Sequence, residues 1–205
     1  MIAIIDYGMG NLRSVQKAFE YLGYQAEITD APARILAADH VVLPGVGAFR
    51  DAMEKLNATG LTGVIRQVAD SGTPLLGICL GMQLMFEHSE ENGHYDGLGF
   101  FPGTVTRFPD SPLKVPHMGW NTLRTRSSCP LFAEGEEPCV YFVHSYCMAD
   151  ISDDFTAAEA DYIIPFTAAV CRGSIMATQF HPEKSGDAGL RMLRRFAEWK
   201  GAASC

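Results

Sequence analysis

The 205-residue sequence has no long apolar run, no basic segment before its first apolar stretch and no cluster of basic residues. Its longest apolar run, within residues 74–86, is interrupted by Gln83 and is too short to cross a bilayer. The apolar stretch at the amino terminus stops at Asp6 and has no basic residues before it, so we expect no signal peptide. Lys and Arg number only 16, are scattered, and leave a net charge of −8. The sequence therefore predicts neither a membrane nor a nucleic-acid partner.

Cysteine is present without the spacing of a metal or redox motif. Six cysteines occur at irregular intervals and no C-x-x-C is found, which predicts a reducing, cytoplasmic setting. Cys139, His144 and Cys147 resemble a zinc set, but on one strand the two cysteines would share a face and His144 would lie on the other. We expect no metal ion and no cofactor. No role is assigned to five of the cysteines: Cys129, Cys139, Cys147, Cys171 and Cys205.

The hydrophobic content of 47% and charged content of 20% are typical of a globular protein, and we expect a single domain over residues 1–205. The first half alternates strands with helices, which predicts a mostly parallel sheet with helices on both faces. Strands are expected at residues 1–6, 25–28, 40–43 and 74–79, and helices at 12–22, from Pro32, at 49–56 and at 61–69. The second half predicts antiparallel or mixed strands at 103–108, 115–125, 140–148, 155–162, 166–172 and 174–180, a small flanking sheet, and a helix at 187–199.

Cys79 lies where the strand at 74–79 meets an apolar pattern that predicts a helix to about His88. A cysteine at so sharp a turn has the geometry of a nucleophile elbow, and Gly77 and Gly81 relieve the crowding there. The amides at the start of the helix favour a thiolate and stabilise an oxyanion on a substrate carbonyl. The alternative is a small buried thiol without reactivity.

The loops after parallel strands meet at the carboxyl edge of the sheet. We therefore expect residues 7–11, residues 44–47 and Cys79 to lie together. Gly45 and Gly47 allow the backbone of residues 44–47 to offer N–H groups to an anion, unless this is an ordinary glycine turn.

His181 supplies a candidate base for Cys79. Pro182 ends the preceding strand, and His181 and Glu183, two residues apart in an extended segment, point the same way. The carboxylate holds one tautomer of the imidazole, which presents its other nitrogen to a thiol. A Cys79–His181–Glu183 triad is the leading hypothesis. The other histidines considered, His40, His88 and His94, are interpreted as ordinary surface or core residues.

With these motifs in view, the chain resembles the class I, triad-type glutamine amidotransferases. The likeness lies in residues 77–83 and 179–185. Four further segments, at residues 6–12, 44–49, 116–121 and 141–146, resemble the family of glutaminase subunits of imidazole glycerol phosphate synthase. The resemblance implies a flavodoxin-like, three-layer α/β fold with extra antiparallel strands.

The resemblance also implies the roles of residues in a glutaminase. Cys79 would attack the side-chain amide of L-glutamine to form a γ-glutamyl thioester, with His181 as general acid and base and Glu183 as its orienter. The oxyanion hole would come from Leu80 and from the loop of Gly45, Val46 and Gly47. The glutamine would be held by four residues: Gln83, His144, Ser145 and Tyr146.

The ammonia would pass to a separate cyclase subunit, a (β/α)₈ barrel that makes imidazole glycerol phosphate and AICAR in histidine biosynthesis. The docking face of the resulting heterodimer would include five residues: Tyr7, Asn11, Met118, Trp120 and Lys184. Three alternatives stay open: a sister glutaminase serving pyridoxal phosphate or another synthase, a stand-alone thiol hydrolase acting on γ-glutamyl compounds, and a flavodoxin-like binding module without catalysis.

Overall fold

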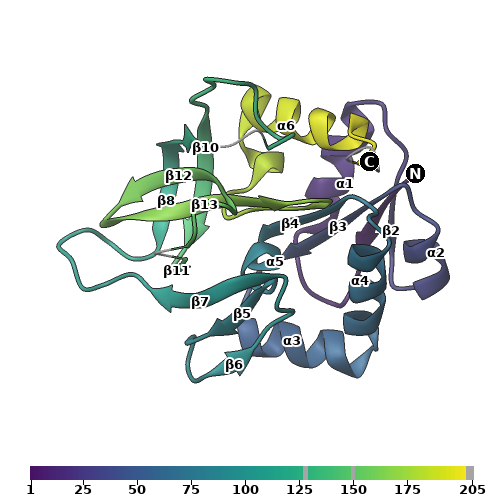
Figure 1. The fold of residues 1–205 in the computed structure, drawn as a ribbon, viewed down its shortest axis with the longest axis horizontal. Coiled ribbons are helices and arrows are strands. Elements are labelled where there is room, and N and C mark those ends of the chain that lie inside the picture. The colour runs from purple at the N-terminus through teal and green to yellow at the C-terminus, as the bar shows by residue number, and fades with distance from the viewer. Residues whose placement is uncertain (127–128, 149–150, 202–205) are drawn as a thin grey trace.

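A large mixed sheet crosses the molecule in the computed structural model, which describes residues 1–126, 129–148 and 151–201 (Figure 1). Its strand order is β2-β1-β3-β4-β14-β13-β12-β9. The strands are β2 (Ala26–Thr29), β1 (Ile2–Ile5), β3 (His40–Gly45), β4 (Leu75–Cys79), β14 (Ile175–Thr178), β13 (Ile164–Arg172), β12 (Thr156–Tyr162) and β9 (Arg124–Thr125).

The first five strands of this order are parallel, and the central ones are covered on both faces. Every residue of β1, β3 and β4 is buried, which explains why their sequences are continuous apolar runs rather than alternating ones. The register places Gly45 at the end of β3 beside Cys79 at the end of β4. The expected meeting of the two loops at one sheet edge is therefore confirmed.

Helices cover the two faces of the sheet (Figure 1). On one face, α1 (Leu12–Tyr21) and α6 (Gly186–Glu198) contribute Val15, Phe19 and Phe196 to a core that includes the aromatic residues of the second half. On the other face, α2 (Pro32–Leu36), α3 (Phe49–Ala58) and α4 (Leu61–Asp70) pack through an apolar stripe. The predicted fold class, an α/β sheet covered on both sides, is confirmed.

Two small sheets, rather than the single one expected, flank the large sheet. One pairs β8 (His117–Thr122) with β10 (Cys139–His144) in antiparallel fashion. The other has the order β11-β7-β5-β6, with β11 (Tyr146–Cys147), β7 (Phe101–Arg107), β5 (Phe86–Ser89) and β6 (Tyr95–Asp96). Strands β5 and β6 were not predicted from the sequence. The single strand predicted at residues 140–148 is two strands, β10 and β11, which belong to different sheets.

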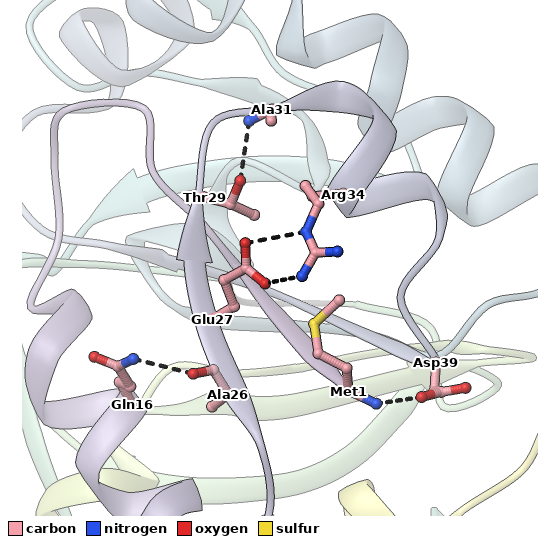
Figure 2. A network of polar contacts seen from close by, with 8 residues as sticks. All are labelled: Met1, Gln16, Ala26, Glu27, Thr29, Ala31, Arg34 and Asp39. Atoms are coloured by element: carbon pink, nitrogen blue, oxygen red, sulfur yellow. Dashed lines mark hydrogen bonds and ion pairs between the residues drawn. The ribbon is translucent and has the colours of Figure 1, made fainter.

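Polar contacts connect β2, the outer strand of the large sheet, to neighbouring elements (Figure 2). The Arg34 guanidinium of α2 pairs with Glu27 of β2, and the Ala31 N–H donates to Thr29 Oγ1 over 3.1 Å. Each exposed contact of this kind contributes little stability, so burial of the Ile35 side chain rather than the ion pair holds α2. Asn11 occupies the cap position of α1, but its side chain makes no capping hydrogen bond.

In the part of the chain that the structure describes, no helix is long and apolar enough to cross a membrane.

Candidate active site

Cys79 forms a strained elbow between β4 and the one-turn helix α5 (Leu80–Gln83). Its φ of 56° and ψ of −110° lie outside the region that residues with a side chain ordinarily occupy. The two glycines are required by close approach: a Cβ on Gly77 would lie 2.9 Å from Gly81 O, and one on Gly81 would lie 1.8 Å from Leu43 O. The predicted crowding at the elbow is therefore present.

The predicted helix to His88 is wrong, because α5 ends at Gln83. Leu84, Met85 and Phe86 are all fully buried, so they do not form one apolar stripe. The chain turns after Leu84 and enters β5, which pairs with β7. A single turn still leaves the Leu80 N–H directly after the nucleophile, but it carries little of the dipole that a full helix would supply.

His181 lies between Cys79 and Glu183. Its Nδ1 is 2.9 Å from Glu183 Oε1, and the ring lines the same pocket as Cys79. The pair is brought together by a 3₁₀ turn, η1 (Pro182–Lys184), not by the extended segment that was expected. Burial alone would lower the pKa of His181, but the hydrogen bonds and charges of Cys79 and Glu183 outweigh it and raise the pKa to about 10.

The η1 turn is fastened to β10 by backbone contacts. The His181 N–H donates to Tyr141 O over 3.0 Å, and the Tyr141 N–H donates to Ser185 Oγ over 3.0 Å. Ser185 Oγ in turn donates to His181 O over 2.7 Å. Together these bonds fix the imidazole relative to the β8–β10 ribbon.

Gln179 is a neighbour of the nucleophile that the sequence analysis did not single out. Its side chain is fully buried, and its Nε2 donates to Cys79 Sγ over 3.8 Å. Gln83 Nε2 donates to Gln179 Oε1 over 3.0 Å and to Tyr146 O over 3.2 Å. The available signal was that Gln179 opens the 179–185 segment, two residues before His181 and directly after β14.

Two neutral histidines extend this buried polar chain. His144 Nδ1 lies 2.8 Å from Tyr146 O, which only accepts, so Nδ1 carries the proton and Nε2 accepts from His117 Nδ1 over 3.0 Å. Burial lowers the pKa of His117 to about 4 and is the main cause that lowers the pKa of His144 to about 3. His144 is therefore a neutral support for the backbone of residues 145–146.

The loop after β3 faces the elbow. Tyr7 Oη donates to Pro44 O over 3.0 Å, and burial raises the pKa of Tyr7, as does the charge of Cys79. Gly47 has a φ of +98°, which favours glycine, and Val46 is 40% exposed. Tyr7 was expected on an exposed docking face. That expectation is wrong: Tyr7 is 4% exposed and supports the loop from inside.

A pocket of about 290 Å³ lies over Cys79. Among its lining residues are Val46, Gly47, Leu80, Gln83, His144, Ser145, Tyr146, His181 and Lys184, so the structure gathers most of the predicted site residues around one cavity. It also adds Glu91, which the sequence analysis missed. The Glu91 carboxylate accepts the Phe49 N–H over 2.7 Å, and no motif spacing pointed to it.

Outside the pocket, Met118 and Trp120 of β8 are 63% and 57% exposed. The Trp120 ring packs against Tyr141, with centroids 5.9 Å apart, and so adjoins the η1 turn. Lys184 is exposed at the pocket rim, and Asn11 is half-buried.

Of the cysteines within the described residues, only Cys79 is among the residues that line this pocket. Cys139 is exposed on β10, whereas His144 of the same strand and Cys147 of β11 are buried, so the three do not form a metal set. Cys129 is buried beside Cys171. Cys205 lies outside the described residues.

A thiol at a strand-to-helix elbow, with an imidazole–carboxylate pair beside it, defines a class of α/β enzymes that attack a carbonyl through cysteine. The family model for "Glutamine amidotransferase class-I" matches residues 3–199, and the chain belongs to this family.

Within that family, the chain is similar to proteins described as imidazole glycerol phosphate synthase subunit HisH. The relative from Syntrophotalea carbinolica is 54% identical, over 97% of this chain and 100% of its own length. That from Geobacter sulfurreducens is 51% identical, over 97% and 99%. Among solved structures, a glutamine amidotransferase has a TM-score of 0.76 at 18% identity, covering 97% of this chain and 98% of that one, which supports the fold.

Proposed function

We propose that this chain is the glutaminase subunit of an imidazole glycerol phosphate synthase. It hydrolyses L-glutamine to glutamate and ammonia and passes the ammonia to a cyclase subunit. The observation that carries the proposal is the placement of Cys79, at a strained elbow, in the same pocket as an imidazole that is itself paired with Glu183. The names of the full-length relatives narrow it to this synthase.

In the first half of the reaction, Cys79 Sγ attacks the δ-carbon of the glutamine side chain. His181 takes the thiol proton, and the tetrahedral intermediate collapses when His181 returns that proton to the departing nitrogen, which leaves as ammonia. The raised pKa of His181 suits this step, because the ring keeps its proton at neutral pH until the leaving group needs it. Glu183 stabilises the imidazolium and fixes its tautomer.

In the second half, water adds to the γ-glutamyl thioester with His181 as general base. The C–S bond then breaks, glutamate leaves, and Cys79 is regenerated. Both tetrahedral intermediates place a negative oxygen beside the elbow. The Leu80 N–H and one amide of the Gly45–Val46–Gly47 loop would bind it, and the positive φ of Gly47 is compatible with turning that amide toward the pocket.

The charges of the pocket suggest how glutamine lies in it. Glu91 offers a carboxylate to the α-ammonium group, and Lys184 at the rim offers an ammonium to the α-carboxylate. Gln83 and the backbone of residues 144–146 would line the side-chain amide. Gln179 and His117, at the two ends of the buried polar chain, hold these groups in place rather than touching the substrate.

The docking face for the cyclase subunit would include Met118, Trp120, Lys184 and Asn11. Two large apolar side chains exposed on a short ribbon are unusual on a solvated surface and typical of an interface. The ribbon is bonded to the η1 turn through Tyr141, so a partner that moves Trp120 acts on the turn that carries His181. The ligand-bound partner would thereby favour the active site arrangement over the resting one.

The test is glutamate release by the purified chain in three conditions: without addition, with the cyclase subunit, and with cyclase plus its nucleotide substrate. We expect a rise on the order of a hundredfold, which corresponds to about 2.7 kcal/mol of bias. Trp120→Ala should reduce that rise, whereas Leu36→Ala, an exposed apolar residue on the distant α2, should not. Equal rates in all three conditions would favour the stand-alone hydrolase instead.

A further inference from the structure

The β5–β6 hairpin brings together three metal-ligating side chains that the sequence analysis treated as unrelated or left unnoticed. His88 and Asp96 are directly opposite in the antiparallel register, so their side chains project from the same face. His88 Nδ1 lies 3.0 Å from Asp96 Oδ1. The ring of His94, from the connecting turn, lies over that of His88 with centroids 4.9 Å apart. One ligand atom from each residue lies within 4.8 Å of the others.

We propose that His88, His94 and Asp96 bind one divalent transition-metal ion, with zinc as the reference case. Two imidazole nitrogens and a carboxylate oxygen are three of the four ligands of a tetrahedral zinc site, and water completes it. At zinc–ligand distances of about 2.0–2.1 Å, neighbouring ligands lie roughly 3.4 Å apart. His88 and Asp96 are already near that separation. His94 and Asp96 are exposed, so their side chains are free to rotate through the remaining distance.

The donor set and the surrounding charge both favour such an ion. Imidazole nitrogen suits zinc, nickel and copper, whereas magnesium and calcium prefer oxygen alone. Residues 87–96 contain four acids and no Lys or Arg. Arg50 reaches Tyr95 from α3 but is itself paired with Asp51 and Glu54. A cation therefore approaches a hairpin whose own charge is negative.

The site is distinct from the Cys79 pocket but shares a turn with it. Glu91 lies in the chain between His88 and His94, its N–H donates to Ser89 Oγ over 3.2 Å, and its carboxylate accepts the Phe49 N–H. An ion held by His88 and His94 joins the two ends of this turn. Binding then stabilises the closed turn, and with it the position of Glu91 at the pocket.

The test measures zinc binding by competition with a chromophoric chelator. It uses the full-length chain carrying Cys79→Ala, so that the elbow thiol binds no metal. We expect one zinc ion per chain. His94→Asn and Asp96→Asn should each weaken it at least tenfold, since losing a direct ligand costs no less than losing its outer-shell support. Glu90→Gln is the matched control: it removes an exposed acid from the same hairpin but no ligand, and should stay within about threefold.

Two further measurements identify the place of the ion. The absorption spectrum of bound cobalt should be that of a nitrogen and oxygen site, without a thiolate charge-transfer band. Zinc should slow the amide hydrogen exchange of residues 89–95 in the Cys79→Ala chain, but not when that chain also carries His94→Asn. The proposal is overturned if zinc does not bind, if His94→Asn binds it as tightly as the parent, or if the thiolate band places it on another cysteine. All readings are taken without glutamine, so their outcome is independent of the proposed function.

Discussion

Replacing Gly81 with alanine should displace the elbow that carries Cys79. The added Cβ would lie 1.8 Å from Leu43 O, and such atoms essentially never approach closer than 3.0 Å, so the two must separate by at least about 1.2 Å. Leu43 cannot yield, because it is fully buried in β3 and lies opposite Gly77 of β4. Overpacking of this severity costs about 3 kcal/mol of unfolding free energy, and a displacement of 1 Å costs about a hundredfold in rate.

The assay pairs urea denaturation with glutamate release in the presence of the cyclase subunit. Gly63→Ala is the matched control, because Gly63 lies exposed in α4 with nothing within 4 Å of the added Cβ. Removing a glycine from a helix interior should stabilise the chain by about 0.5–1 kcal/mol and leave the rate unchanged. A Gly81→Ala chain that unfolds at the wild-type urea concentration, with a rate within about twofold of wild type, would refute the reasoning.

Three further changes have expected outcomes. Gly47→Val should cost on the order of a hundredfold in glutaminase rate, because the residue needs its positive φ to offer an oxyanion donor; a rate within about twofold of wild type would place the hole elsewhere. Glu183→Gln should slow the reaction less than His181→Ala does, since it leaves the base in place; steady-state rates decide, and the reverse order would contradict the assignment. Acid should destabilise the fold: the lowered pKa values of His117 and His144 mean that the unfolded chain binds more protons below pH 6.5, so the stability that these two histidines contribute is full above that pH and is lost toward about pH 4. The unfolding free energy should fall by about 1.4 kcal/mol per pH unit for each extra proton that the unfolded chain binds. If the unfolding free energy of the wild type falls with acid no more steeply than that of His144→Asn, the two histidines are not a neutral pair.

The parallel half of the fold could be predicted because its strands and helices differ in length and period. Buried strands such as β1 and β4 are short continuous apolar runs, while α1 and α4 carry an apolar stripe. The segment after Gln83 could not be assigned in this way. Its apolar residues are buried on every side by tertiary packing, so their spacing does not distinguish a helix from the turn and strand that form.

At the site, short sequence motifs predicted those residues that are also close together in the sequence. His181 and Glu183 are two residues apart, so one short turn brings the imidazole and the carboxylate together. Glu91 and the His88–His94–Asp96 cluster arise differently, because they depend on a hairpin whose strands were not predicted. Tyr7 was misplaced for a related reason: an aromatic residue in a glycine-rich loop looks exposed, and its burial against the end of β3 depends on tertiary packing.

The covalent state of Cys79 during turnover tests the central claim most directly. The chain, assembled with cyclase and its nucleotide substrate, is mixed with glutamine and quenched in acid. It is then digested, and the masses of the cysteine-containing peptides are measured by mass spectrometry. We expect a γ-glutamyl adduct on the Cys79 peptide alone, and a loss of glutamate release by at least about 10⁴-fold in Cys79→Ala. Continued turnover in Cys79→Ala, or an adduct on a different cysteine, would contradict it.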